Sequence, residues 1–289
     1  VVPYVPGGGT DFTARVISPK LSEALGQQVV VENRPGGGTN IGSDLVAKAA
    51  PDGYTLLMAG AANAINMSLY AKLPYDTLRD FAPVILAADA PMVLSVHPQL
   101  KVNTVSQLLA LAKAKPGQLN CASPGTGTAN HLGCELLKTM AAIDIEHIPY
   151  KGSAAVTTAV LAGEVPIMFS NLISTMPQVQ AGRFRALGVT GLTRLAAAPD
   201  IPTIAEAGLP GYEVVGWYGF MAPAGTPPDI INRLSAQTAK SLQSPEVLKR
   251  FASEGIDPVG STPEAFAKVI REDLVKWAEV VRVSGAKVD

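Results

Sequence analysis

Val1–Leu25 reads VVPYVPGGGTDFTARVISPKLSEAL and predicts a strand, a glycine turn and a helix in that order. Val1–Val5 is a short run rich in valine, which is typical of a buried strand. Pro6–Asp11 contains three consecutive glycines, and the apolar residues of Phe12–Leu25 recur at helical spacing until Gly26. This order is the first half of a strand–helix–strand unit, and it indicates an α/β protein.

The same alternation recurs along most of the chain. Further strands are predicted at residues 28–32, 55–59, 93–96, 119–122, 146–149, 165–169, 185–189 and 212–221. Further helices are predicted at residues 41–50, 104–115, 129–141, 153–162, 175–181, 230–242, 245–254 and 263–283. Short apolar strands that alternate with helices favour mainly parallel sheets with helices on both faces.

The length of 289 residues suits two compact domains better than one small core. The helices predicted at 230–283 have no strands of their own, so we expect them to pack on the first sheet. We therefore predict two lobes around a cleft, the first made of residues 1–97 plus 220–289 and the second of residues 98–219. The two crossings, near 93–98 and 215–221, are expected to form a hinge.

The composition excludes several classes of protein. The chain has 23 Lys and Arg residues against 24 Asp and Glu residues. Its net charge of −1 therefore produces no positive electrostatic field that would attract nucleic acid or an anionic membrane. With 47% hydrophobic residues the chain is not disordered. The most apolar stretch, 81–96, is interrupted by Pro83, Asp89 and Pro91, so no membrane span is predicted. The sequence starts inside a predicted strand, and we expect a signal peptide to have been removed.

Three glycine turns, at residues 7–9, 36–38 and 125–127, each join a predicted strand to a predicted helix. Unpaired backbone N–H groups at the start of a helix, together with the helix dipole, bind anions without help from Lys or Arg. The third glycine of the dinucleotide motif is replaced by Phe12, Ile41 and Asn130, and no phosphate-loop lysine motif occurs. We therefore expect a small anion as ligand, with no nucleotide and no other cofactor.

Ser123 is a candidate nucleophile, because Cys121–Gly125 resembles the serine elbow of hydrolases in a strand-to-helix context. The first glycine of that motif is absent, and Pro124 has no N–H to donate to an oxyanion. Ser123 is better interpreted as a hydroxyl that binds a ligand or caps a helix. A hydrolase-like enzyme acting on a small carboxylate or acyl compound, with Ser123 or His131 in the chemistry, is the alternative function.

Other polar residues have structural explanations beside functional ones. The three histidines lack the spacing of metal ligands, so no metal site is predicted. Arg34 fits either a bidentate clamp on a carboxylate or an ion pair with Glu32. Asp11 would repel an anion, so its default role is the N-cap of the first helix.

A series of motifs resembles the Bug family of solute receptors, which are the extracytoplasmic binding components of tripartite tricarboxylate transporters. The first are PYVPGGGTD (3–11), VVENRPGGG (30–38) and PDGY (51–54). The later ones are KLPYD (72–76), RDFAP (79–83), PYKG (149–152), RALGVT (185–190) and IPT (201–203), followed by Glu206, Trp217 and Gly219. The resemblance covers nearly the whole chain.

The resemblance implies a periplasmic binding protein of type II that is not an enzyme. Such a receptor captures a small carboxylate in the cleft between its lobes, through backbone amides, hydroxyls and bridging waters, and delivers it to transporter subunits in the membrane. We expect it to be a monomer. The implied ligand residues of the first lobe are Tyr4, Gly8, Gly9, Thr10, Asp11, Gly38, Thr39, Asn40, Ala59, Ala61 and Asn63. Those of the second lobe are Ser123, Gly125, Thr126, Gly127, Thr128, Tyr150, Ser170 and Asn171.

Two features depart from the family's pattern. Members often carry an acidic residue after the strand that here ends in Phe169, where this chain has Ser170 and Asn171, so an amino-acid ligand is less favoured. Cys121 and Cys134 are not general to the family, and the sequence is compatible with either a periplasmic disulfide or two free thiols. A sensor that presents its ligand-bound form to a signalling membrane protein is a further alternative.

Overall fold

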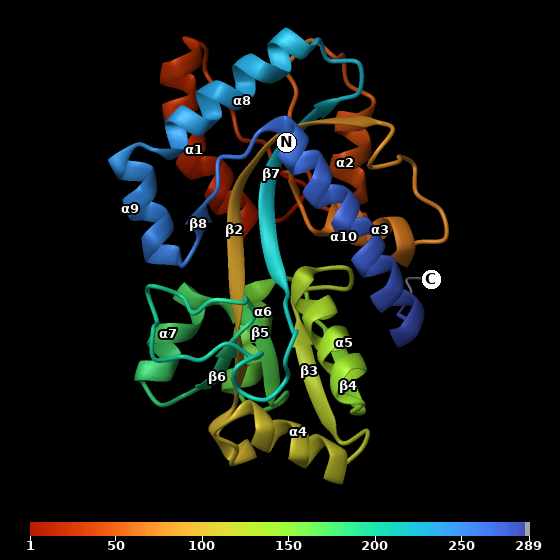
Figure 1. The fold of residues 1–289 in the computed structure, drawn as a ribbon, viewed down its shortest axis with the longest axis vertical. Coiled ribbons are helices and arrows are strands. Elements are labelled where there is room, and N and C mark those ends of the chain that lie inside the picture. Colours follow the sequence, from red (N-terminus) through yellow and green to blue (C-terminus); the bar gives the residue numbers. More distant parts are fainter. Residues whose placement is uncertain (287–289) are drawn as a thin grey trace. The chain divides into compact units, whose positions relative to one another are not determined.

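A computed structural model describes residues 1–286, and the chain divides into two compact units (Figure 1). Unit 1 contains Val1–Ala90 and Trp217–Ala278, and unit 2 contains Pro91–Gly216 and Glu279–Ala286. In each unit, helices pack against a sheet, so the predicted α/β class is confirmed.

Unit 1 contains helices from both ends of the chain. They are α1 (Gly9–Leu25), α2 (Asn40–Ala47), α3 (Ala62–Leu69), α8 (Pro228–Leu242), α9 (Pro245–Glu254) and most of α10 (Pro263–Ser284). Its strands are β1 (Leu57–Gly60), the first part of β2 (Phe81–Val96), most of β7 (Val215–Pro223) and β8 (Asp257–Pro258). The strand order is β1-β7-β2 with β8 on β2, and β1 and β8 both pair antiparallel with their neighbours.

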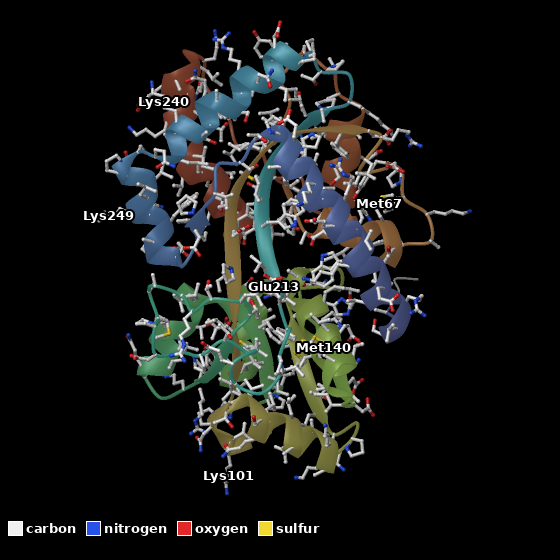
Figure 2. The ribbon with its side chains drawn as sticks, viewed as in Figure 1. Met67, Lys101, Met140, Glu213, Lys240 and Lys249 are labelled. Atoms are coloured by element: carbon white, nitrogen blue, oxygen red, sulfur yellow. A yellow bond between two sulfur atoms is a disulfide. The ribbon has the colours of Figure 1, made fainter. Side chains whose placement is uncertain are left out.

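One hydrophobic core joins α1 to the C-terminal helices. Ile17 and Leu21 on the inner face of α1 belong to the same buried cluster as Leu234 of α8, Phe251 of α9 and residues of β2. The charged side chain of Lys240 projects outward from α8 (Figure 2). α8 and α9 thus bury apolar side chains in one cluster with α1 and β2, and such burial stabilises an amphipathic helix.

The first two predicted strands do not form a ladder. Among the described residues, the first segment makes one isolated parallel bridge, from Val2 to Asn33, which lies just beyond the run at 28–32. Pro3 has no N–H to continue the ladder of hydrogen bonds. The run at 28–32 is largely exposed, so pairing there would bury little apolar surface. Residues 1–5 still lead directly into the first glycine turn.

Unit 2 contains the middle of the chain. Its helices are α4 (Val105–Ala114), α5 (Ala129–Ala141), α6 (Ser153–Leu161) and α7 (Leu172–Gln180). Its strands are β3 (Leu119–Ser123), β4 (Ile145–Pro149), β5 (Ile167–Asn171), β6 (Arg185–Val189) and the end of β2. β3 pairs parallel with β4 and β5, whereas β2 pairs antiparallel with β5 and β6.

The sheets are therefore mixed, and the expectation that each is mainly parallel is wrong for the described ladders of unit 1. The burial pattern explains the error. All four residues of β1 are buried, and a strand buried on both faces is apolar in sequence whichever way its neighbour runs. The unit boundaries lie inside β2, between Ala90 and Pro91, and inside β7, between Gly216 and Trp217.

Candidate functional site

The first glycine turn of unit 1 leads into α1. Gly8 is the N-cap of this helix in an extended conformation, and no side chain caps it. Among the described residues, the backbone N–H groups of Gly9, Thr10 and Asp11 have no hydrogen-bond partner. They lie at the positive end of a helix of 17 residues, so they are donors suited to an anion.

Asp11 lies in the first turn of α1 and not at its N-cap, so its predicted role is wrong. The helix begins before it, at Gly9, and the Asp11 carboxylate instead accepts hydrogen bonds from the Gly7 N–H (3.0 Å) and the Asn33 amide (2.8 Å). Arg15 pairs with it at 3.0 Å. Burial raises the pKa of Asp11, but the bonds from Arg15, Gly7 and Asn33 outweigh it and lower the pKa below its ordinary value. Because Arg15 neutralises this carboxylate, Asp11 does not cancel the positive end of α1.

Two tyrosines of unit 1 lie against glycines. A Cβ atom on Gly9 would overlap Tyr218 Oη and lie 2.9 Å from its Cζ, so residue 9 has room for hydrogen alone. Tyr4 Oη lies 3.4 Å from the place of a Cβ on Gly60. Burial raises the pKa of both hydroxyls, to about 12 for Tyr218. Both phenols are therefore neutral at physiological pH and able to donate hydrogen bonds.

The second glycine turn is strained at its last residue. Positive φ angles occur at Gly36 (127°), Gly37 (56°), Gly38 (62°) and Thr39 (82°). Thr39 is β-branched, and for such a residue a left-handed conformation costs about 1–3 kcal/mol. The Asn66 amide holds this turn by donating to the Gly38 carbonyl (2.7 Å), Thr39 Oγ1 (3.3 Å) and Asn40 Oδ1 (2.8 Å). Asn40 Oδ1 also accepts a hydrogen bond from Tyr75 (2.9 Å).

Replacing Thr39 tests this strain directly. Thr39→Gly and Thr39→Ala both remove the hydroxyl and the methyl group, but Ala keeps a Cβ in the left-handed region. We expect Thr39→Gly to be more stable than Thr39→Ala by about 1 kcal/mol. Urea unfolding of the two variants measures the difference, and equal midpoints with equal slopes would show that residue 39 is not left-handed in solution.

The predicted residues after β1 are buried. Ala59, Ala61 and Asn63 are 0%, 4% and 0% exposed. Asn63 Oδ1 accepts the Gly60 N–H (3.1 Å), and its amide donates to Ser43 Oγ (2.9 Å). The side chain of Asn63 thus ties α3 to α2, and its polar atoms are used within unit 1.

The third glycine turn, in unit 2, is largely satisfied by its own contacts. The Gly125 N–H donates to Ser123 Oγ (3.2 Å), and the Gly127 N–H donates to His131 Nδ1 (3.2 Å). Thr128 caps α5 by accepting the His131 N–H (3.3 Å). In the part of the chain that the structure describes, the N–H groups left without a partner here belong to Thr126, Ala129 and Asn130. The positive end of α5 therefore offers three donors, as does the positive end of α1.

Ser123 makes contacts that do not suit a nucleophile. Its hydroxyl lies 2.6 Å from His147 Nε2, a distance suitable for a nucleophile and its base, but the residue is fully buried. The same oxygen contacts the Gly125 carbonyl (3.0 Å) and accepts the Gly125 N–H. Pro124 follows it and has no N–H for an oxyanion. These contacts hold the turn in place.

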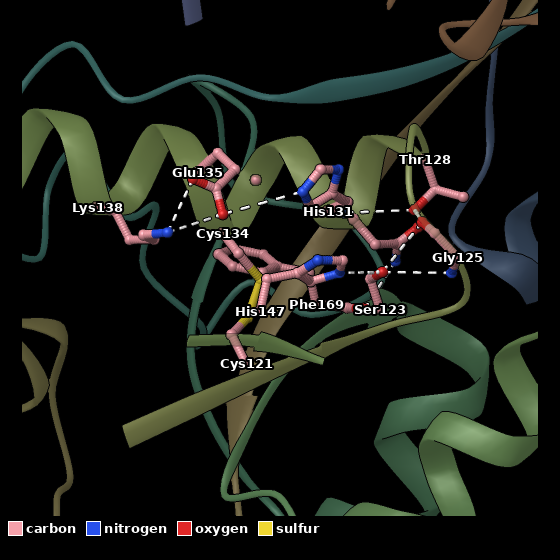
Figure 3. Close-up of a disulfide and its surroundings, with 12 residues drawn as sticks. Cys121, Ser123, Gly125, Thr128, His131, Cys134, Glu135, Lys138, His147 and Phe169 are labelled. Carbon is pink, nitrogen blue, oxygen red and sulfur yellow. Dashed lines mark hydrogen bonds and ion pairs between the residues drawn. A yellow bond between two sulfur atoms is a disulfide. The ribbon is translucent and has the colours of Figure 1, made fainter. Parts of the chain in front are cut away.

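A disulfide joins Cys121 in the middle of β3 to Cys134 on α5, so of the two alternatives the structure has the bond (Figure 3). The two Cα atoms are 6.4 Å apart, within the usual range for a disulfide. The bond closes a loop with a sequence separation of 13, and this loop contains the whole third glycine turn.

Breaking this disulfide is expected to destabilise the protein. A loop of about 15 residues restricts the unfolded chain by about 3 kcal/mol, so Cys121→Ala with Cys134→Ala should lower the free energy of unfolding by about that amount. Urea unfolding with and without a reductant measures it: the reductant should destabilise the wild type and leave the double variant unchanged. An equal response of both proteins would mean that the thiols are not joined.

The remaining predicted residues of unit 2 follow β4 and β5. The Tyr150 N–H donates to the Ser123 carbonyl (2.9 Å). Ser170 Oγ is hydrogen-bonded to Thr175 Oγ1 (2.5 Å), and the Asn171 carbonyl accepts the same threonine hydroxyl (2.8 Å). The backbone of Tyr150 and the side chain of Ser170 are thus engaged within unit 2.

Several residues that shape these turns were not among the predicted ones. Asn33, Asn66, Asn130 and His147 each fix a turn or helix end from a distance in sequence; for example, the Asn130 amide donates to the Phe169 carbonyl (2.7 Å). The abundance of asparagine beside glycine turns was the available signal, because amide side chains satisfy the backbone groups that such turns leave unpaired.

Arg34, metal ligands and membrane-spanning helices are the remaining features that the sequence raised. Arg34 pairs with Glu32, which is one of its two predicted roles. Within residues 1–286 there is no group of three or more potential metal ligands. Each helix described there is too short or too polar to cross a bilayer.

The family is shown by comparison with known proteins. The model of the tripartite tricarboxylate transporter family receptor, TctC, matches residues 13–285. The chain belongs to this receptor family. BugT of Bordetella pertussis is 39% identical over 100% of this chain and 89% of its own, which confirms the resemblance to Bug receptors. Members of this family are solute-binding receptors, and the chain is accordingly a receptor and not a hydrolase.

Three solved structures support the fold of this TctC-family receptor. A structure described as a periplasmic transporter is 40% identical, with a TM-score of 0.90 over 100% of this chain and 97% of its own. A Rhodopseudomonas palustris protein with adipate is 36% identical, with a TM-score of 0.90 over 98% and 96%. MatC from the same species, with bound malate, is 31% identical, with a TM-score of 0.87 over 97% and 97%. The predicted periplasmic-binding-protein fold is confirmed.

Proposed function

We propose that this receptor binds a small dicarboxylate in the periplasm and delivers it to a membrane transporter of the tripartite tricarboxylate type. The observation that carries the ligand class is the pair of donor sets at α1 and α5, each with three backbone N–H groups that have no partner among the described residues. Such groups bind carboxylates without a cationic side chain. The two relatives solved with adipate and malate hold ligands of this chemistry.

The energetics suit a carboxylate that is held by several backbone N–H groups. A hydrogen bond to a charged group contributes about 1.5–3 kcal/mol. Three or four of them, after the cost of ordering, reach the roughly −8 kcal/mol of a micromolar ligand. Of the residues predicted above, the principal donors are proposed to be Gly9, Thr10 and Asp11 in the first turn of α1 and Thr126 beside α5, whose N–H groups have no partner among the described residues.

Calorimetric titration tests the ligand class. Malate, adipate, citrate and glutamate should be compared with the dimethyl esters of the two dicarboxylates, which keep the carbon skeleton and lose both charges. We expect micromolar binding of a dicarboxylate and no heat from its ester. Binding of the ester with similar affinity, or of none of the acids, would contradict the proposal.

The same preparation tests the remaining parts of the proposal. A receptor releases its ligand unchanged, so mass spectrometry after overnight incubation should recover the acid intact. We further propose that the receptor is a monomer. Light scattering with and without ligand should give the mass of one chain of 30.0 kDa, and a dimer mass would contradict this part alone.

A further inference from the structure

A buried polar cluster lies behind the third glycine turn, and we call it the histidine cluster: Ser123, His131, Glu135, Lys138 and His147 (Figure 3). The two imidazole rings have their centroids 3.9 Å apart. His131 Nε2 lies 3.9 Å from Glu135 Oε1, and Glu135 pairs with Lys138 at 2.9 Å. His131 and Glu135 are each 3% exposed. His131 and Glu135 are therefore shielded from water, whereas His147 and Lys138 are partly exposed.

The contact between His131 and the turn defines the state of the ring. The Gly127 N–H donates to His131 Nδ1 at 3.2 Å, so Nδ1 must be unprotonated and the ring proton must be on Nε2, which faces Glu135. Burial, with the nearby His147 and Lys138, lowers the pKa of His131 to about 3. The ring therefore stays neutral, with Nδ1 free to accept, throughout the physiological range.

This contact determines which N–H groups of the turn are free. Gly125 and Gly127 both have positive φ angles, 149° and 83°, and each N–H is held by a side chain of the cluster. The intervening N–H of Thr126 has no partner among the described residues. Without an acceptor at Nδ1, the Gly127 peptide would be free to rotate, and the direction of the Thr126 N–H would no longer be defined.

We propose that His131 is a positioning residue, which fixes the turn by accepting the Gly127 N–H and so aims the Thr126 N–H at the ligand. The inference rests on the proposed carboxylate binding for its effect on affinity, but the His131–Gly127 contact itself does not depend on a ligand. Thr126, Ala129 and Asn130 then act together as one preorganised set of donors, and less conformational entropy is lost when a carboxylate binds.

Two amide variants separate positioning from packing. His131→Asn places an oxygen near the position of Nδ1 and keeps an acceptor for Gly127, whereas His131→Gln places its amide near Nε2 and His131→Ala removes both. We expect His131→Asn to bind the dicarboxylate within about threefold of wild type, and the Gln and Ala variants to lose about tenfold or more, which is the effect of one hydrogen bond. Equal affinity of all four proteins would overturn the inference.

Nitrogen NMR of the free protein tests the contact without any ligand. The imidazole nitrogen shifts should show His131 as the Nε2–H tautomer, and the Gly127 amide should be protected from exchange in wild type and His131→Asn but not in His131→Gln. An Nδ1–H tautomer, or an unprotected Gly127 in wild type, would overturn the inference. If instead the contact is present and the wild type binds no carboxylate, the proposed function fails and the positioning contact stands.

Discussion

Lowering the pH from about 7 to about 4 is expected to reduce the free energy of unfolding by about 3 kcal/mol for each histidine of the histidine cluster. Burial, together with Lys138 and, for His131, the ring of His147, lowers the pKa of His131 to about 3 and that of His147 to about 4, against an ordinary value of 6.5. Below pH 6.5, both histidines therefore become protonated in the unfolded chain while they stay largely neutral in the folded chain. Stability from these groups is full above pH 6.5 and falls as the pH drops toward the folded pKa values.

The double variant His131→Asn with His147→Gln is the matched control. It keeps an acceptor near Gly127 and a polar atom near Ser123 but removes both titrating rings. Asp11 does not obscure the comparison. Its pKa is lowered, so the stability that its carboxylate contributes is lost mainly as the pH falls below the ordinary pKa of 3.8. Urea unfolding monitored by circular dichroism at several pH values should give a steep slope for the wild type and a shallow one for the variant. Parallel slopes would show that the two histidines titrate normally.

Gly9→Ala is expected to lower affinity for the carboxylate by about 10-fold to 100-fold, the effect of losing one charge-assisted hydrogen bond. The new Cβ would overlap Tyr218 Oη, so the tyrosine and the first turn of α1 must move apart to make room. The N–H groups of Gly9, Thr10 and Asp11 would shift with it. Overpacking of this kind also costs about 1–3 kcal/mol of stability.

Two further variants identify the cause. Gly8→Ala adds a Cβ that meets nothing within 4 Å at a φ without strain, so it should unfold at nearly the wild-type urea concentration. Tyr218→Phe in the Gly9→Ala background removes the overlapping oxygen and should restore part of the lost affinity. Calorimetry and urea unfolding measure both effects. An unaltered affinity of Gly9→Ala would mean that this turn does not bind the ligand.

The sequence predicted those elements whose signals are local. The helix that ends at Leu25 before Gly26, and the strand Arg185–Val189, lie where periodicity and glycine place them. α3 was missed because Ala62–Leu69 is short and contains Asn63 and Asn66, which favour caps and turns over helix interiors. In the fold, both asparagines are used to hold neighbouring turns, so tertiary contacts override the local preference.

The candidate site was predictable in outline and not in detail. The glycine turns identified the donors, because a helix start leaves N–H groups unpaired wherever it occurs. The Gly125 and Gly127 N–H groups donate to Ser123 and to His131, and the contact between Ser123 and His147, which comes from another strand, was not predictable. Pairing of that kind depends on register between strands, which composition and spacing do not specify.

The covalent ring closed by Cys121 and Cys134 also bears on how such a receptor can diversify. Since the bond secures both ends of the segment that carries Thr126, the residues between can be exchanged with less risk to folding. Selection for a new nutrient can then act on the segment's chemistry while the crosslink maintains its place, so lineages with this bridge should show wider sequence variation inside the ring than lineages without it.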